Sequence, residues 1–227
     1  MGPPRLKPAY YALAPGGWRD YVTVLHVPYT LWNLSYVALG AAIAPQFSTD
    51  RMLWTMAAFA LALGVAAHML DELNGRPLAT RIGSGTLVVL SALSLAGACA
   101  IGVWAAFAWG FGLLGFVAVG AFVVPAYNLE WFGGRLHNAW GLALSWAAFP
   151  VVTAYFAQAL TIRPEAVLAA AYATAMILVQ RTLSTPVRRA RRELGTMEGV
   201  EPMERALRIL PWAGVLLAAA LVTSRLT

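Results

Sequence analysis

The chain has 227 residues, of which 60% are hydrophobic and 11% are charged, and its net charge is +6. A soluble domain of this length usually carries about twice that charged fraction, so a water-soluble globule is excluded and lipid must solvate much of the surface. The basic residues fall between apolar segments, which indicates membrane orientation and contact with anionic lipid rather than with nucleic acid. The single cysteine, Cys99, excludes an intrachain disulfide.

Apolar segments of membrane-spanning length follow one another along the chain, since a span needs about 20 mainly apolar residues. A polar N-terminal segment, residues 1–20, precedes them. The predicted fold is all-α: one polytopic transmembrane helical bundle of about seven spans over residues 21–227, with no separate soluble domain. The predicted spans are 21–44, 52–73, 84–106, 109–127, 137–160, 165–183 and 207–224.

Basic residues are distributed unevenly between the two faces of this predicted bundle. With seven spans, residues 1–20 share one side with the connections 74–83, 128–136 and 184–206. Thirteen of the sixteen lysines and arginines fall on that side, and the positive-inside rule makes it cytoplasmic. We therefore predict a protein of the inner or plasma membrane with a cytoplasmic N-terminus and an external C-terminus.

The end of the second span carries the first candidate metal ligands, in the run AAHMLDELNGRPL. His68 lies three residues before Asp71 and four before Glu72, so a helix places all three on one face. An imidazole with one or two carboxylates at this spacing can ligate a divalent ion. The alternative is a helix end that leaves the membrane, where the two carboxylates are merely solvated.

The other two histidines are also predicted at cytoplasmic ends of spans, where an ionisable group is costly unless it is paired or functional. His26 lies in the first span, and His137 begins the fifth. Glu130 lies in the connection just before His137. We predict that His26, Glu130 and His137 complete or flank the metal site, although each alone is also typical of a membrane interface.

The run 188–192 contains four arginines. One interpretation is a topology determinant beside anionic lipid. The other is a phosphate or diphosphate clamp over the same cavity, because the planar guanidinium group binds phosphate through two hydrogen bonds. The candidates for contact with a substrate headgroup are Arg135, Arg188 and Arg189, and Asn33 is a candidate for lining a polar pocket.

Three segments within residues 26–162 resemble the UbiA intramembrane prenyltransferase superfamily. The run HVPYTLWNLSYVALGAAIA resembles the opening helix of that family, and GRPLATRIGSG resembles the loop after its first aspartate-rich motif. The segment YNLEWFGGRLHNAWGLALSWAAFPVVTAYFAQ is similar to the loop and fifth helix. The resemblance implies a helical bundle with a cytoplasmic-face cavity and an isoprenoid or other lipid-soluble substrate, and it makes Arg76 a candidate substrate contact.

The resemblance departs from the family in its aspartate-rich motifs, which hold Mg²⁺ after helices two and six. The second position here offers Thr185, Pro186 and arginines but no aspartate, and a ligand set with histidine suits a divalent transition metal better than Mg²⁺. We predict a UbiA-like membrane metalloprotein that acts as an enzyme on a lipid-soluble substrate. The alternatives are a non-catalytic subunit of a larger membrane complex, in contact with pigment, quinone or lipid, and a Mg²⁺-dependent prenyltransferase.

Overall fold

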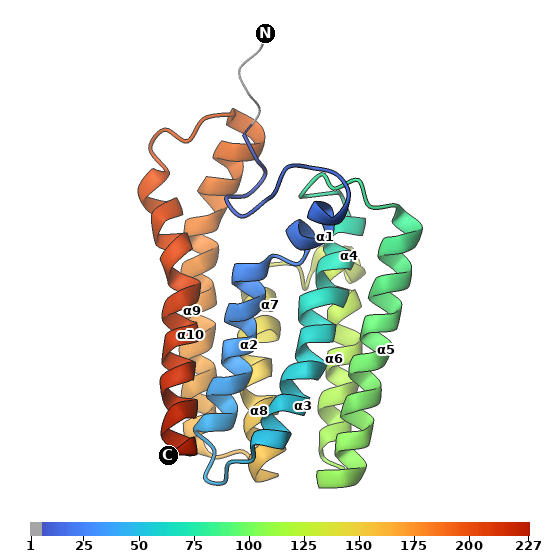
Figure 1. The fold of residues 1–227 in the computed structure, drawn as a ribbon, viewed down its shortest axis with the longest axis vertical. Coiled ribbons are helices and arrows are strands. Elements are labelled where there is room, and N and C mark those ends of the chain that lie inside the picture. Colours follow the sequence, from blue (N-terminus) through green and yellow to red (C-terminus); the bar gives the residue numbers. More distant parts are fainter. Residues whose placement is uncertain (1–5) are drawn as a thin grey trace.

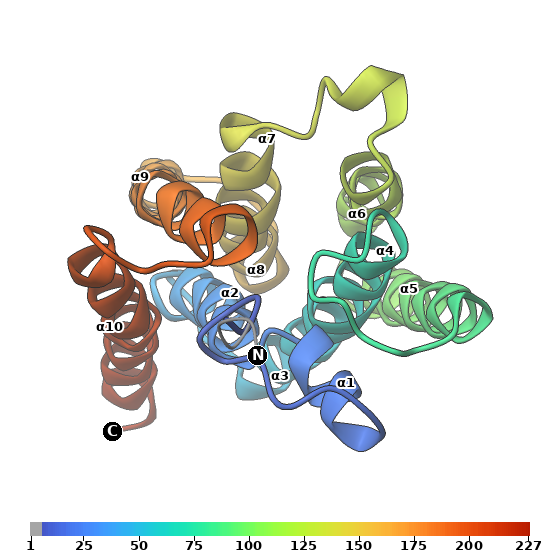
Figure 2. The ribbon, with the colours of Figure 1, turned by 90° about the horizontal axis from the view of Figure 1, so that it is seen from above.

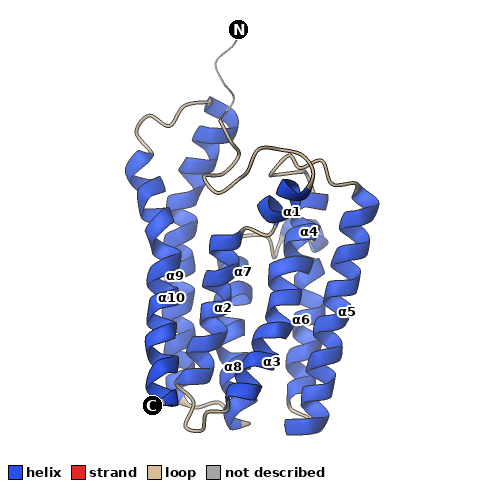
Figure 3. Ribbon diagram, viewed as in Figure 1, coloured by secondary structure: helices blue, strands red, loops and turns tan. Residues whose placement is uncertain are grey.

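The computed structural model describes residues 6–227, which fold into helices joined by short loops, with no strand among them (Figures 1 and 3). The helices occur in this order: α1 (Trp18–Val24), α2 (Val27–Ala42), α3 (Thr49–Phe59), the π-helical η1 (Ala60–Ala67), α4 (His68–Leu73), α5 (Ser84–Trp109), α6 (Leu113–Asn128), the 3-10 turn η2 (Trp131–Gly134), α7 (Ala139–Ala143), the π-helical η3 (Leu144–Ala148), α8 (Phe149–Ala159), α9 (Pro164–Arg189), the π-helical η4 (Ala190–Leu194) and α10 (Glu201–Leu226).

These elements form columns that run alternately up and down the bundle in Figure 1. The columns are α2, α3–η1–α4, α5, α6, α7–η3–α8, α9–η4 and α10. Among residues 6–227, five helices are long and apolar enough to cross a membrane. Both α2 and α6 have 16 residues and are shorter. The prediction of an all-helical membrane protein is confirmed, whereas the count of seven spans stays a prediction.

The first predicted span, 21–44, is not one helix. α1 ends at Val24 and α2 begins at Val27, and between them His26 adopts a left-handed conformation with φ 46° and ψ 46°. Pro28 in the first turn of α2 accounts for the break, because proline lacks the N–H that would continue the helix from α1 and its ring clashes with the carbonyl four residues earlier. A left-handed non-glycine residue costs roughly 1–2 kcal/mol, so the surrounding structure must hold His26 in place.

The predicted connection over residues 184–206 is too long, because its first half is helical in the structure. α9 continues to Arg189 and then through η4 to Leu194, so that only residues 195–200 link it to α10. Arginine, alanine and glutamate, which make up most of this extension, are good helix formers. The arginine run is therefore one end of a long helix that extends beyond its apolar part.

α2 lies at the centre of the bundle and packs against α8 and α10 (Figure 2). Trp32 and Tyr36 on its buried face are about 1% exposed. Two glycines allow the close approach of these helices: a Cβ atom at Gly40 would collide with the carbonyl of Val151 in α8, and one at Gly214 in α10 would collide with Trp32. Larger residues at these positions would force the columns apart.

The outer surface and the C-terminal end of the bundle complete the membrane pattern. α5 turns Val89, Leu93 and Phe107 outward, and all three are more than half exposed, which suits a helix face solvated by lipid. At the end of the bundle that holds the C-terminus, Arg51 donates to the carbonyls of the last turn of α8, and Arg225 donates to the carbonyl of Ala44. These arginines thus lie at the end opposite the arginine run.

Candidate functional site

A cavity of about 1150 Å³ opens at the end of the bundle where α9 ends and α10 begins. Residues of the N-terminal segment, α2, α4, α6, η3 and α9–η4 line it. The predicted site residues that line this cavity are His26, Asn33, His68, Asp71, Arg76, Glu130, His137 and Arg188. Glu72, Arg135 and Arg189 are not part of its wall.

His26, between α1 and α2, and His68, the first residue of α4, are brought together although they are 42 positions apart in the sequence. Their rings are stacked, with centroids 4.4 Å apart and an angle of 11° between the planes. Nδ1 of His68 lies 3.1 Å from the carbonyl oxygen of Gly64, and Nδ1 of His26 lies 3.1 Å from the hydroxyl of Tyr11. Nε2 of His26 is buried and has no hydrogen-bond partner in the described part of the chain.

His137, which also lines the cavity, repeats part of this arrangement. Its Nδ1 lies 3.1 Å from the carbonyl oxygen of Tyr127, and its ring stacks on the Tyr127 ring at 4.6 Å. A carbonyl only accepts, so Nδ1 of both His68 and His137 must carry the proton when the rings are neutral. The Nε2 atom of each ring is then left as a hydrogen-bond acceptor or a ligand.

Glu72 has a structural role within the loop that follows α4. Its carboxylate accepts hydrogen bonds from the N–H of Leu78 at 2.9 Å and from the N–H and hydroxyl of Thr80, both at 2.8 Å. The side chain is 1% exposed. Of the predicted set at the end of the second span, His68 and Asp71 therefore line the cavity, whereas Glu72 holds the loop in place.

Arg76 and Glu130 lie on the cavity wall but are engaged by neighbouring groups. The guanidinium of Arg76 donates to the carbonyl of Ile82 at 2.6 Å and to the hydroxyl of Ser84 at 2.7 Å. Glu130 accepts a hydrogen bond of 3.3 Å from Asn74, whose amide also donates to a carbonyl at the end of α6. These contacts fix the two loops beside the cavity.

A metal ion would need several ligands converging on one point. Among residues 6–227, no group of three or more histidine, cysteine, aspartate and glutamate side chains is close enough to hold one. Glu72 is already satisfied, and the in-plane lone pairs of the parallel His26 and His68 rings do not converge. The side chains as arranged do not form a metal site, and a bound transition metal stays a prediction.

Three arginines of α9–η4 face the cavity without an acidic partner. Arg181, Arg188 and Arg192 are seven and four residues apart, which places them on one helical face, and all three line the cavity. In the described residues, none of their guanidinium groups makes an ion pair or a hydrogen bond. By contrast, Arg189 points outward, 70% exposed, and pairs with Glu193 at 3.5 Å.

Backbone irregularities gather around the same cavity. Four residues with positive φ that are not glycine, His26, Arg76, Ala79 and Glu130, all line it. Such strained conformations cluster at functional sites in proteins. The π-helical segments border it as well: η1 leads into His68, η3 contains Trp146, and η4 contains the last arginines of the run. Single π-helical turns are frequent at functional sites.

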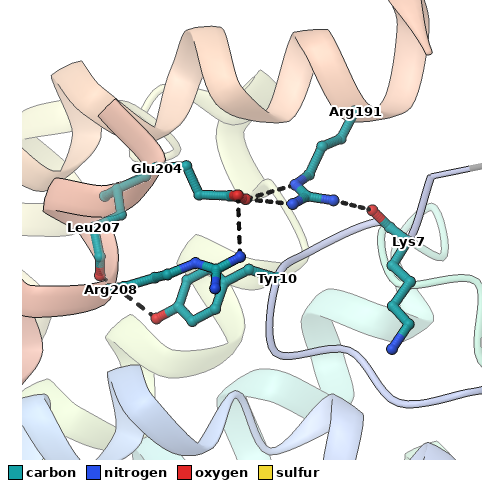
Figure 4. Close-up of polar contacts among 6 residues, drawn as sticks. All are labelled: Lys7, Tyr10, Arg191, Glu204, Leu207 and Arg208. Atoms are coloured by element: carbon teal, nitrogen blue, oxygen red, sulfur yellow. Dashed lines mark hydrogen bonds and ion pairs between the residues drawn. The ribbon is translucent and has the colours of Figure 1, made fainter. Parts of the chain in front are cut away.

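The N-terminal strap, which we define as residues 6–17, contributes to the cavity wall, and Figure 4 shows its polar contacts with η4 and α10. Glu204 of α10 accepts from Arg191 and Arg208, and Arg191 also donates to the carbonyl of Lys7 in the strap. Tyr10 donates a long hydrogen bond of 3.5 Å to a carbonyl of α10. The strap is thereby attached to both α9–η4 and α10.

Several wall residues were not predicted from the sequence. The polar face of α9, which includes Gln180 and Arg181, has a helical spacing that continues into Arg188 and could have indicated the wall. Tyr10 and Tyr11 lie in a proline-rich segment with no periodic pattern, and only the fold brings them to the cavity.

Comparisons of the chain with protein-family models, with curated proteins and with solved structures give no match. The resemblance to the UbiA superfamily therefore stays a prediction.

Proposed function

We propose that the chain is a UbiA-like integral membrane protein of seven spans that binds a lipid-soluble substrate with an anionic headgroup in the cavity and acts on it as an enzyme. The observation that carries this proposal is the set of three unpartnered arginines, which lines one cavity together with the histidines and Asp71. An anionic headgroup would supply the missing partner.

The electrostatic argument starts from Arg188, which lies between Arg181 and Arg192 on the cavity face of α9–η4. Like charges on one partly buried face repel each other, and a cation without a partner is costly away from water. Asp71 lies among these charges but is not within ion-pair distance of them. A phosphate or diphosphate has enough oxygens to bind two or three guanidinium groups at once.

The apolar part of the wall suits the remainder of such a ligand. Leu142, Trp146 and Ile177 line the cavity from α7, η3 and α9. A volume of about 1150 Å³ is slightly above the usual range for small-molecule sites, roughly 300–1,000 Å³. The cavity can therefore hold both a charged head and a hydrocarbon chain.

The orientation and the class of chemistry follow from the same end of the bundle. The arginine run and the strap lie there, so the positive-inside rule assigns this end, and the N-terminus, to the cytoplasm. Histidines with free Nε2 atoms and the carboxyl of Asp71 provide groups for general acid–base catalysis next to the bound head. A divalent transition metal is not required for any part of this proposal.

Binding of farnesyl diphosphate and of neutral farnesol to the detergent-solubilised protein, measured by calorimetry in the presence of a chelator, tests the proposal. We expect the diphosphate to bind more tightly. Arg188→Gln should weaken diphosphate binding about 10- to 150-fold, since a hydrogen bond to a charged group contributes roughly 1.5–3 kcal/mol. Arg189→Gln is the matched control, because Arg189 is the sequence neighbour of Arg188 but points away from the cavity. Equal binding by the two variants, or equal binding of both ligands, would contradict the proposal.

A further inference from the structure

Asn33 brings an amide to a part of the cavity wall that is otherwise apolar. It is the seventh residue of α2, about 9 Å along the helix axis from the first, and it lines the cavity. Trp32 beside it packs in one apolar cluster with Ile177 of α9. One turn further along α2, Val37 packs in another cluster with Trp146 of η3. A polar side chain in such surroundings is costly unless it is hydrogen-bonded.

The side chain of Asn33 makes no hydrogen bond within residues 6–227, although it is only 6% exposed. The other two asparagines of the cavity wall are both paired. Nδ2 of Asn128 donates to the carbonyl of Val124 at 2.7 Å, and Nδ2 of Asn74 donates to the carbonyl of Asn128 at 3.1 Å. Asn128 thus satisfies its amide within its own helix, whereas Asn33 does not.

The amide of Asn33 can be reached from the cavity. In the described part of the chain, two side-chain polar atoms are both sealed off and unpaired, Nε2 of His26 and the hydroxyl of Tyr36. The unpaired amide of Asn33 is not sealed off in this way, and the open space beside it is the cavity. The same holds for the indole N–H of Trp146, which lines the cavity, is 5% exposed and has no acceptor among the described residues.

We propose that Asn33 binds a carbonyl oxygen on the hydrophobic part of the ligand, with the indole of Trp146 as a second donor on the same wall. The amide of Asn33 has two N–H donors, and an indole N–H can only donate. A carbonyl oxygen accepts hydrogen bonds and has no proton of its own that would need an acceptor in these apolar surroundings. The inference rests on the proposed function, because it narrows the lipid-soluble substrate to one that carries a carbonyl group.

Binding of 8-pentadecanone, a neutral ketone, and of pentadecane, which lacks the oxygen, tests the carbonyl site without the anionic site. The ketone carries ¹³C at its carbonyl, whose infrared band moves to lower frequency when the oxygen accepts a hydrogen bond. With the detergent-solubilised protein we expect a lower-frequency band that detergent alone does not give. Asn33→Leu should remove this band and weaken ketone binding about two- to tenfold, because one neutral hydrogen bond is lost.

Two controls separate the carbonyl site from folding defects. Pentadecane should bind Asn33→Leu at least as well as the unchanged protein, which shows that the cavity is intact. Asn128→Leu is the matched variant, since Asn128 also lines the cavity but its amide is already paired, and it should keep the band.

An unshifted band in the unchanged protein, or a shifted band that persists in Asn33→Leu, would overturn the proposal. If farnesyl diphosphate still binds through Arg188 in that case, the carbonyl site alone is refuted and the anionic site stands. If the ketone band behaves as expected but Arg188→Gln leaves diphosphate binding unchanged, the anionic site is refuted and the carbonyl site stands.

Discussion

Glu204 joins three parts of the cavity mouth, and its neutralisation should destabilise the protein strongly. One carboxylate oxygen accepts from Arg191 through Nε at 2.7 Å and Nη2 at 2.5 Å, and the other accepts from Arg208 at 3.2 Å. The side chains of Arg191 and Glu204 are only 10% and 11% exposed. Glu204→Gln keeps the size of the side chain but removes the charge that balances Arg191.

The magnitude follows from burial. Breaking a buried ion pair by removal of one partner costs about 3–5 kcal/mol, because the other charge is left uncompensated. Glutamine still offers one carbonyl oxygen, so we expect the lower end, roughly 3 kcal/mol. Glu193→Gln is the control: its pair with Arg189 has side chains that are 70% and 68% exposed, and such helix-surface pairs contribute about 0.3–0.5 kcal/mol.

Thermal unfolding of the detergent-solubilised variants, followed by tryptophan fluorescence, measures the difference. For a chain of this size, 1 kcal/mol corresponds to roughly 2–4 °C in Tm, so Glu204→Gln should lower Tm by about 6–12 °C and Glu193→Gln by about 2 °C or less. The double variant Arg191→Met with Glu204→Leu should recover much of the loss, since apolar residues often replace a buried pair without destabilisation. Equal Tm values for the two single variants would show that the buried pair does not stabilise the cavity mouth.

Three further predictions concern orientation, metal and reaction. In a Cys99→Ser background, a cysteine at Glu198 should react only with reagents on the cytoplasmic side and one at Thr161 only from outside; the reverse would invert the orientation. If the predicted metal binds, elemental analysis should find about one or two transition-metal ions per chain, most of them lost in His68→Ala, whereas a folded, metal-free protein would end that prediction. Because no second aspartate motif is present, Mg²⁺ should not stimulate release of pyrophosphate from farnesyl diphosphate, and chelator-sensitive release would restore the alternative of a Mg²⁺-dependent prenyltransferase.

The helices themselves were largely predictable, because long apolar runs have few alternatives in a membrane protein. The second predicted span, 52–73, corresponds to the helical column Thr49–Leu73. Helix ends were less predictable where a helix does not end together with its apolar segment. The extension of α9 beyond Ser184 is charged, so hydropathy could not find it, although its residues favour helix. Pro28 is a local signal for the break at His26, but a prediction from apolar character alone continues the span through it.

The sequence indicated several residues that line the cavity, but it did not indicate which side chains contact one another. The spacing predicted that His68 and Asp71 share one helical face; both line the cavity, and their role as ligands stays a prediction. The same spacing assigned Glu72 to that face, but the loop after α4 folds back onto its carboxylate. Contacts between distant segments, such as His26 on His68, depend on the packing of α2 against η1 and of α1 against α4, and they have no signature in the sequence.

Photo-cross-linking of an alkyl phosphate that carries a diazirine in its chain tests the central claim most directly, because it locates the bound ligand without relying on any reaction. With the phosphate held by the arginines, the chain should label peptides that contain Leu142, Trp146 or Ile177, and an excess of unlabelled alkyl phosphate should suppress the labelling. Arg188→Gln should reduce it and Arg189→Gln should not. Labelling confined to the outer face of α5, around Leu93, and unchanged in Arg188→Gln, would contradict a cavity that binds an anionic lipid.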